Sequence, residues 1–159
     1  MRIRILAIGR LKEKYWREAF AEYAKRLRPY ARFEALEGPE ADTGRESNDR
    51  EKELVLEKEG RFFLGKISED DYNIALDLDG DMVTSEELAA VIEREAMMKG
   101  KNVNFLIGGS LGMSDAVKRR CHRRIAFGRA TFPHQMIRVF LAEQIYRGFK
   151  IIRGEPYHK

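Results

Sequence analysis

Cysteine occurs only once in this 159-residue sequence, at Cys121, so the chain cannot form an internal disulfide bond. The usual structural zinc sites need at least two cysteines, and one cysteine with three histidines does not build them. We therefore expect no metal site. A chain without disulfide bonds is typical of a reducing compartment, and the sequence favours a cytoplasmic protein.

Long hydrophobic runs are also missing. The apolar stretch near the beginning, residues 5–8, is too short to be the core of a signal peptide. No run approaches the roughly 20 apolar residues that a membrane-spanning helix needs. We therefore expect neither a targeting segment nor a membrane partner.

Acidic residues are scarce in the last third of the chain. The whole sequence holds 30 lysines and arginines against 26 acidic residues, which gives a net charge of +4. Residues 110–159 hold 11 basic and 3 acidic residues, whereas residues 1–109 hold 19 basic and 23 acidic ones. Such a basic end indicates an anionic partner, and nucleic acid is the first candidate.

Apolar residues make up 43% of the chain, which excludes general disorder, and the length suits one domain, residues 1–159. Their spacing predicts strands at residues 2–9, 33–37, 73–78, 103–107 and 124–127. It predicts helices at residues 12–27, 49–64, 84–98, 115–121 and 133–149, with polar turns at 38–48 and 79–81 and an irregular tail from residue 153. This alternation predicts an α/β fold with a mostly parallel sheet.

Ligands of such sheets bind beyond the carboxyl ends of the strands, which points to the loops after Leu78, Ile107 and Phe127. The second of these loops is the glycine-rich segment 108–112, where backbone is able to approach a ligand closely. An ordinary turn explains the same glycines, since the segment matches neither GxGxxG nor a P-loop. A dinucleotide-binding enzyme is a weaker alternative, because no acidic residue stands near Arg129 and Ala130, about 20 positions on.

Basic and titratable residues crowd the C-terminal third. The cluster Lys118, Arg119, Arg120, Arg123 and Arg124 has Asp115 as its only nearby acid, and it is either a phosphate-binding patch or a solvated face. On the last helix, Glu143 and Arg147 either pair as a surface salt bridge or form, with Arg138, a row that faces a phosphate or a substrate. His134 opens this helix and is more often a capping or packing histidine than a catalyst, and Thr131 or its neighbour is a candidate cap. The tail Tyr157-His158-Lys159 acts only if it docks, and otherwise frays.

Four segments carry a resemblance to a known family: RIRILAIGRLKEKYW, NFLIGGSLG, TFPHQMIRVFLAEQIYRGFKI and RGEPYHK. Over essentially its whole length the sequence resembles the ribosomal RNA large-subunit methyltransferase H family of the SPOUT class. This resemblance implies a homodimer with a C-terminal trefoil knot. It also implies a SAM-dependent (S-adenosylmethionine-dependent) methylation of N3 of a pseudouridine in 23S ribosomal RNA, on the assembled ribosome.

The resemblance also implies the site residues. Cofactor contacts fall on Leu76, Gly108, Phe127, Gly128, Arg129, Ala130, Thr131 and Phe132. Serine and methionine are common in the family where this chain has Gly128 and Ala130, so backbone contacts are expected there. The RNA contacts are predicted from the basic charge of the C-terminal third and not from the resemblance, and they fall on Lys118, Arg119, Arg120, Arg123, Arg138 and Lys159.

The chemistry of the implied reaction suggests catalytic roles for residues near the C-terminus, as hypotheses. His158 would accept the N3 proton, Arg147 would stabilise the developing negative charge, Glu143 would hold Arg147, and Tyr157 would stack on the base. Proton loss to water, with the protein only positioning the reactants, is the alternative. A non-catalytic RNA-binding factor shares the basic third and is a separate alternative for the whole chain.

Overall fold

The computed structural model describes residues 1–42, 44 and 46–159. Its centre is a five-stranded sheet with the order β2-β1-β4-β3-β5. The strands are β1 (Arg2–Ile8), β2 (Arg32–Gly38), β3 (Tyr72–Met82), β4 (Val103–Ile107) and β5 (Arg123–Ala126), and all neighbours pair in parallel. The helices are α1 (Lys14–Leu27), α2 (Asp49–Leu64), α3 (Ser85–Ile92), η1 (Glu93–Met98), α4 (Asp115–Arg119) and α5 (His134–Ile152). The predicted α/β fold with a parallel sheet is confirmed.

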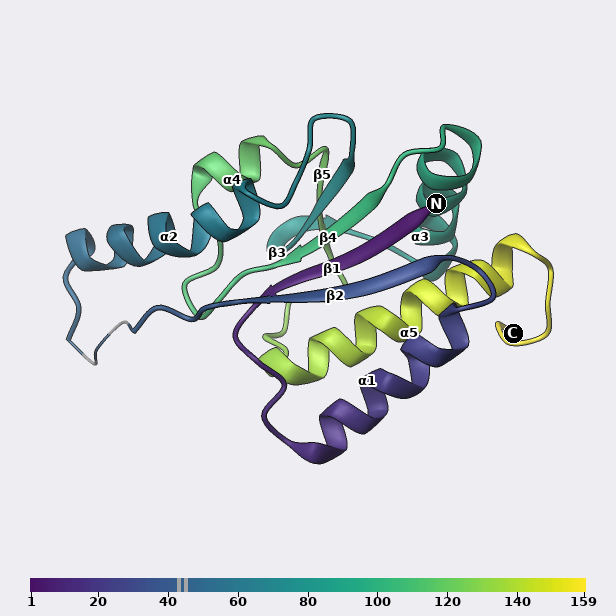
Figure 1. Ribbon diagram of the computed structural model, residues 1–159, viewed down its shortest axis with the longest axis horizontal. Coiled ribbons are helices and arrows are strands. Elements are labelled where there is room, and N and C mark those ends of the chain that lie inside the picture. The colour runs from purple at the N-terminus through teal and green to yellow at the C-terminus, as the bar shows by residue number, and fades with distance from the viewer. Residues whose placement is uncertain (43, 45) are drawn as a thin grey trace.

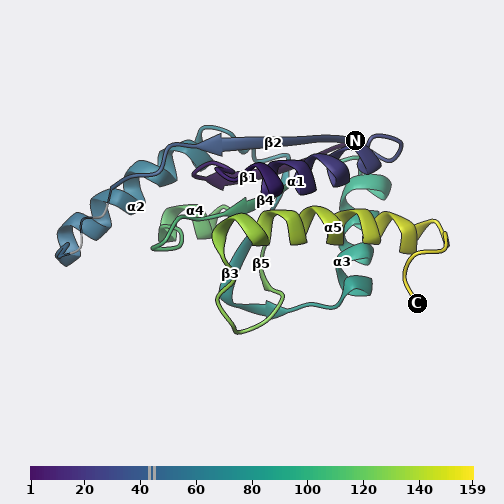
Figure 2. The ribbon, with the colours of Figure 1, turned by 90° about the horizontal axis from the view of Figure 1, so that it is seen from below.

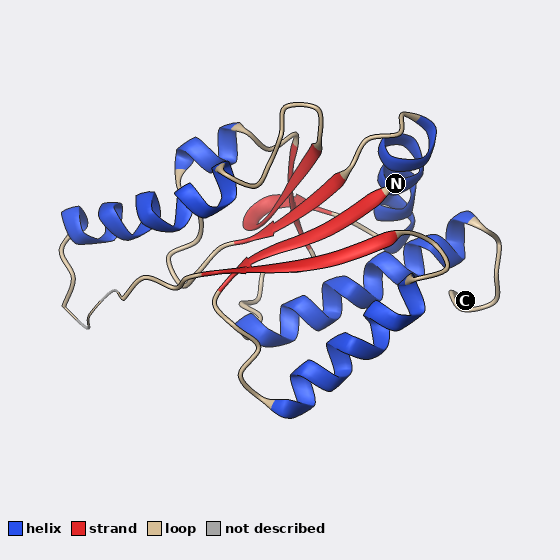
Figure 3. Cartoon of the chain, in the orientation of Figure 1, coloured by secondary structure: helices blue, strands red, loops and turns tan. Residues whose placement is uncertain are grey.

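Helices cover both faces of the sheet (Figure 3). Side chains alternate between the faces along a strand, so Ile3 and Ile5 of β1 pack in the core under α1, α3 and α5. Leu6 and Ile8 point to the other face and pack with residues of α2 and α4. A strand that is buried on both faces reads as a continuous apolar run, as β1 does in the sequence.

The third strand is longer than its sequence indicates. Asp79, Gly80 and Asp81 were expected to close the strand, yet β3 continues through them to Met82. Its pairing with β5 shifts register between Leu76 and Asp81. A Cβ on Gly80 would stand 2.6 Å from the Arg124 carbonyl carbon, so only glycine lets the two strands approach this closely. Figure 2 shows this end of β3 beside the segment that follows β5.

Two helices also depart from the prediction. The helix expected over residues 84–98 is α-helical only to Ile92 and continues as the π-helix η1. The expected cap of α5 at Thr131 is wrong, because Pro133 is the N-cap residue and no side chain caps the helix. Thr84 caps α3 in a capping box, with Glu87 as its partner.

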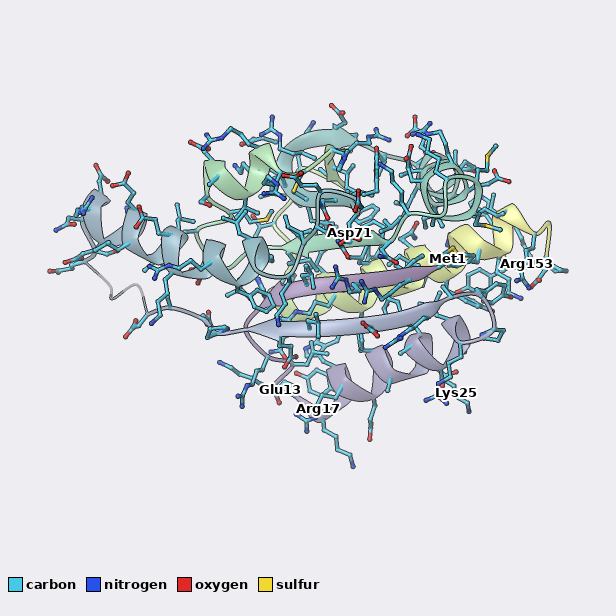
Figure 4. All side chains as sticks on the ribbon, turned by 45° about the horizontal axis from the view of Figure 1, so that its top comes forward. Met1, Glu13, Arg17, Lys25, Asp71 and Arg153 are labelled. Atoms are coloured by element: carbon cyan, nitrogen blue, oxygen red, sulfur yellow. The ribbon has the colours of Figure 1, made fainter. Side chains whose placement is uncertain are left out.

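The amino ends of the strands are closed by a buried polar network. Arg4 of β1 donates hydrogen bonds to Asn104 Oδ1 at 2.7 Å and to Asp71 Oδ2 at 2.9 Å. Asn104 Nδ2 in turn donates to Asp71 and to Asn73. Figure 4 labels Asp71 at this end of the molecule. Because these buried groups satisfy one another, this edge is structural and leaves the opposite edge for a ligand.

Helix α5 connects the two ends of the molecule. It begins beside the carboxyl ends of the strands and ends near the N-terminus, where the C-terminal tail folds back (Figure 1). Within the described part of the chain, no helix is long and apolar enough to cross a membrane. Functional groups at the two ends of α5 are therefore separated by the length of that helix.

Candidate cofactor cleft and tail network

A cleft of about 620 Å³ opens at the carboxyl ends of β3, β4 and β5. All three loops that the sequence singled out contribute to it. Its walls are mainly apolar and include Leu76, Ile107, Phe127, Phe132 and Ile137. Both its size and this lining are typical of a cofactor site.

Two adjacent glycines form the wall after β4. A Cβ on Gly108 would collide with the Gly112 carbonyl group and stand 2.9 Å from Met113 Cγ. A Cβ on Gly109 would stand 2.7 Å from a carboxylate oxygen of Glu59. The doublet is thus required by close packing on both sides, and it leaves its backbone facing the cleft.

Glu59 of α2 lies behind this glycine wall, and it is not among the site residues predicted from the sequence. Its Oε1 accepts a hydrogen bond from the Ala41 amide at 3.2 Å, while its buried Oε2 has no hydrogen-bond partner among the described residues. Burial raises the pKa of this carboxyl group, and the Ala41 amide offsets only part of that effect. The sequence carried no signal for it, because Glu59 is one of many acidic residues on a charged helix.

Most of the predicted cofactor residues line the cleft: Leu76, Gly108, Phe127, Gly128, Thr131 and Phe132. Arg129 and Ala130 are not part of the lining. The Arg129 side chain turns to β3 and donates to the carbonyl oxygens of Leu78 and Gly80. A cofactor contact at positions 129 and 130 stays a prediction, and it now depends on their backbone.

His134 and Arg138 connect the cleft to the rest of the sheet. His134 lines the cleft, and its Nε2 contacts the Gly108 carbonyl oxygen. Arg138 Nη2 donates to the carbonyl oxygens of Ile8 at 2.7 Å and Gly9 at 2.9 Å, and it lies 3.5 Å from His134 Nδ1. Arg138 is only 3% exposed, which favours a structural role, and its contact with RNA stays a prediction.

The basic cluster around α4 is partly neutralised. Lys118 and Arg124 each lie 3.4 Å from Asp77, an acid on β3 that the sequence does not place nearby. Burial would raise the pKa of Asp77, but the Asp79 amide and the two cations hold it below its ordinary value. Arg119 and Arg120 are exposed, and Arg123 is half-buried. The phosphate-binding role of the cluster stays a prediction that rests mainly on these three arginines.

The C-terminal tail docks on α5 and on the beginning of α3, so the tail is not a frayed end. Glu143 Oε1 accepts hydrogen bonds from Arg147 Nη2 at 2.6 Å and from the Tyr157 hydroxyl at 3.0 Å. Burial and this hydrogen bond raise the pKa of Tyr157. His158 Nδ1 lies 3.3 Å from Arg147 Nη1, and its Nε2 lies 2.8 Å from Glu86. An arginine nitrogen only donates, so Nδ1 is the acceptor and Nε2 carries the hydrogen given to Glu86.

The cleft lies at the beginning of α5, and the tail network lies toward the end of this helix. His134 lines the cleft and Arg147 belongs to the tail network, and both are on this helix. The two residues are thirteen positions apart, which at 1.5 Å of rise per residue corresponds to about 20 Å. The predicted catalytic residues and the predicted cofactor residues therefore do not meet within one chain.

The fold and the cleft define the class of this protein. Residues 1–158 match the family model described as a predicted SPOUT methyltransferase. A probable methylase family protein from Haemophilus influenzae superposes with a TM-score of 0.55 and 15% identity, covering 99% of this chain and 70% of its own. A probable rRNA-methyltransferase from Porphyromonas gingivalis gives the same TM-score at 14% identity, covering 96% and 69%. At these identities the two structures support the fold alone.

Curated relatives identify the family more closely. Proteins named ribosomal RNA large subunit methyltransferase H from Listeria monocytogenes and Enterococcus faecalis are 49% and 46% identical to this chain. Each alignment covers 100% of both sequences. The chain therefore belongs to the ribosomal RNA large subunit methyltransferase H family of SPOUT methyltransferases. This membership favours methyl transfer over the dinucleotide-binding and non-catalytic alternatives.

Proposed function

We propose that this protein methylates N3 of a pseudouridine in 23S ribosomal RNA, with SAM as methyl donor and the assembled ribosome as substrate. The glycine-walled cleft at the carboxyl ends of the strands carries the proposal. The name of its full-length relatives supports an rRNA substrate. Such a substrate supports a cytoplasmic location as part of the proposal. A C-terminal trefoil knot, as the resemblance implies, belongs to the same proposal.

The cleft has the features that SAM requires. Its apolar walls suit the adenine ring, and Gly108 and Gly109 expose a backbone that no Cβ shields. Leu76, Phe127, Gly128, Thr131 and Phe132 complete the holding surface, with backbone contacts from Arg129 and Ala130. SAM supplies an electrophilic methyl group with its own leaving group, so the protein needs only to align it with N3 of the base.

A homodimer brings together the predicted cofactor residues and the predicted catalytic residues, which lie apart within one chain. About 20 Å along α5 separates the cleft from the tail network of the same chain. We infer that the tail of one copy completes the cleft of the other, as happens when two copies pack with their α5 helices antiparallel. Each dimer then has two equivalent sites.

The tail residues have distinct roles in this arrangement. Tyr157 offers an aromatic ring to the target base. Arg147 turns its guanidinium to the negative charge that develops on the base, while Glu143 limits its movement. His158 Nδ1, released from Arg147, is the ring nitrogen with a free electron pair and takes the N3 proton.

A methylation assay tests the function. We expect SAM-dependent methyl incorporation into assembled 70S ribosomes, with mass spectrometry of the digested RNA placing the methyl group on pseudouridine. Naked 23S rRNA is the comparison substrate and is expected to react much more slowly. Equal rates on both substrates would contradict the ribosome preference, and methylation of a different nucleotide would contradict the target.

Mixing two inactive variants tests the composite site. Gly108→Val destroys the cleft and His158→Ala disables the tail. If sites form between chains, half of the dimers in an equal mixture are mixed and hold one intact site, which restores about a quarter of the wild-type activity. If each chain uses its own tail, the mixture stays inactive.

A further inference from the structure

We propose that the beginning of α1 is a second RNA-contacting surface, which grips the substrate strand on the side of the cleft opposite α4. The surface consists of Arg10, Lys12, Lys14 and the aromatic ring of Tyr15, and it is called the α1 surface below. The proposal rests on the proposed function, because its ligand is the ribosomal RNA that presents the target base. None of these residues belongs to the predicted RNA-binding set.

The α1 surface is anchored to the wall of the cleft. Gln135 Oε1 accepts hydrogen bonds from the Lys12 amide at 2.6 Å and from the Glu13 amide at 3.3 Å. Gln135 directly follows His134, which lines the cleft. Arg17 Nη1 donates to the carbonyl oxygens of Leu11 and Lys12 and thereby holds the same turn. The segment is thus fixed next to the cleft mouth, although it is far from the glycine wall in sequence.

The side chains of this surface are exposed and carry uncompensated charge. Residues 10–17 include four basic side chains and one acidic one. The side chains of Arg10 and Lys12 form no ion pair within the described part of the chain, and Lys14 lies 3.6 Å from the exposed Glu18. Figure 4 shows the neighbouring Glu13 and Arg17 at this end of α1, away from the sheet. Arg10 and Lys12 are therefore available to bind phosphates, and Lys14 has only one exposed partner that competes with them.

An aromatic platform stands between the cations. Tyr15 is 62% exposed, and its ring centre lies 5.2 Å from that of Trp16. Burial of an aromatic ring away from water is favourable, yet the Tyr15 ring remains exposed to solvent in this chain. Basic side chains interleaved with exposed aromatic rings are typical of surfaces that bind single-stranded RNA, where bases stack on the rings.

The position of the α1 surface beside the cleft suits it to hold the RNA substrate. α1 covers one face of the sheet and α4 the other, and the cleft opens at the edge between them. Lys118 of α4 lines the cleft from its own side. An RNA strand that delivers a base into the cleft therefore crosses both flanks, and cations on each flank hold its phosphates. A second copy of the chain is a poorer occupant, since charged residues are depleted in the cores of protein interfaces.

A matched pair of double variants tests the surface. Lys12→Gln with Lys14→Gln removes two charges from the α1 surface, and Lys52→Gln with Lys58→Gln removes two from α2 on the other sheet face. Ribosome binding is measured between 50 and 300 mM salt with purified 70S ribosomes. We expect the first variant to lower the log–log salt slope by up to about two units, roughly one for each phosphate contact. The α2 variant should keep the wild-type slope, and both should bind SAM normally.

Tyr15 separates stacking from charge. Tyr15→Ala is expected to weaken ribosome binding by roughly tenfold through loss of base stacking, while Tyr15→Phe, which keeps the ring, should bind like the wild type. An unchanged salt slope in the Lys12/Lys14 variant would overturn the proposal. Dissociation of the dimer of the Lys12/Lys14 variant in sedimentation experiments would also overturn the proposal, because the α1 surface would then be an interface between copies. If wild-type protein methylates no ribosomes at all, it is the proposed function that fails.

Discussion

The Nε2 atom of His134 is hydrogen-bonded to the carbonyl oxygen of Gly108 at the base of the cleft. A carbonyl oxygen only accepts, so Nε2 carries the hydrogen, and the α5 helix is thereby attached to the glycine wall after β4. The contact joins residues 26 positions apart in sequence. It explains why a histidine expected merely to cap or pack instead stabilises the wall on which cofactor binding depends.

The first prediction concerns the glycine wall after β4. Gly108→Ala is expected to lower SAM affinity at least tenfold, because its Cβ collides with the Gly112 carbonyl and displaces the loop. Gly128→Ala is the matched control, since its Cβ meets only a Phe132 ring carbon at 3.9 Å. Calorimetry measures both affinities, with thermal unfolding as a check of the fold. Wild-type affinity in Gly108→Ala would mean that the loop is an ordinary turn.

Arg138 is predicted to support stability and not RNA binding. Arg138→Met leaves the buried carbonyl oxygens of Ile8 and Gly9 without their donor, and Glu37 without its cation at 3.2 Å. We expect the free energy of unfolding in urea to fall by about 3 kcal/mol. Arg120→Met, at an exposed position, should change it by less than about 0.5 kcal/mol. Equal losses in the two variants would contradict the structural role of Arg138.

Glu59 is predicted to make stability depend on pH. Burial raises the pKa of this carboxyl group, so the folded protein holds the proton at pH values where the unfolded chain has lost it. The contribution of Glu59 to stability is therefore complete below the ordinary glutamate pKa and is lost as the pH rises through the raised value.

Glu59→Gln removes this titration while keeping the acceptor for the Ala41 amide. We expect the variant to be more stable than the wild type at pH 8, by roughly 1–3 kcal/mol, and to lose the advantage toward pH 4. Urea unfolding between pH 4 and 8 measures the difference. Glu57→Gln, an exposed neighbour on α2, serves as the control. Parallel stability curves for wild type and Glu59→Gln would refute the prediction.

The tail is predicted to act in catalysis and not in cofactor binding. Deletion of residues 157–159 should leave SAM affinity intact, because none of the residues that line the cleft belongs to the tail. The methylation rate with saturating ribosomes should nevertheless fall by about a hundredfold or more, through loss of the proton acceptor and the stacking ring.

His158→Ala distinguishes the roles within the tail. If His158 accepts the N3 proton, the methylation rate of the wild type rises with pH, whereas the rate of the His158→Ala variant does not show this rise. Lys159→Gln is the control for the end of the chain, with a change expected in ribosome affinity and not in the pH profile. A truncated enzyme with the wild-type rate would show that the docked tail has no catalytic role.

The sequence alone determined the layers of this protein and the edge where its site lies. Alternating strands and helices predicted a parallel sheet, and the carboxyl-end rule selected the loops after β3, β4 and β5 that line the cleft. These features are local, because the spacing of the apolar residues within a segment predicts whether that segment is a buried strand or an amphipathic helix. The four segments that carry the family resemblance predicted the same cofactor site.

Only the tertiary structure decided which charged residues face solvent and which are structural. Arg138 looks like a surface cation in sequence, and it is buried because three strand and helix ends converge on it. Asp77 neutralises Lys118 and Arg124 across 41 and 47 positions, and Glu59 reaches Gly109 across 50. Likewise, β3 extends through an apparent turn because β5 pairs with it. Such contacts join residues distant in sequence, and since charge acts through space, no local pattern contains them.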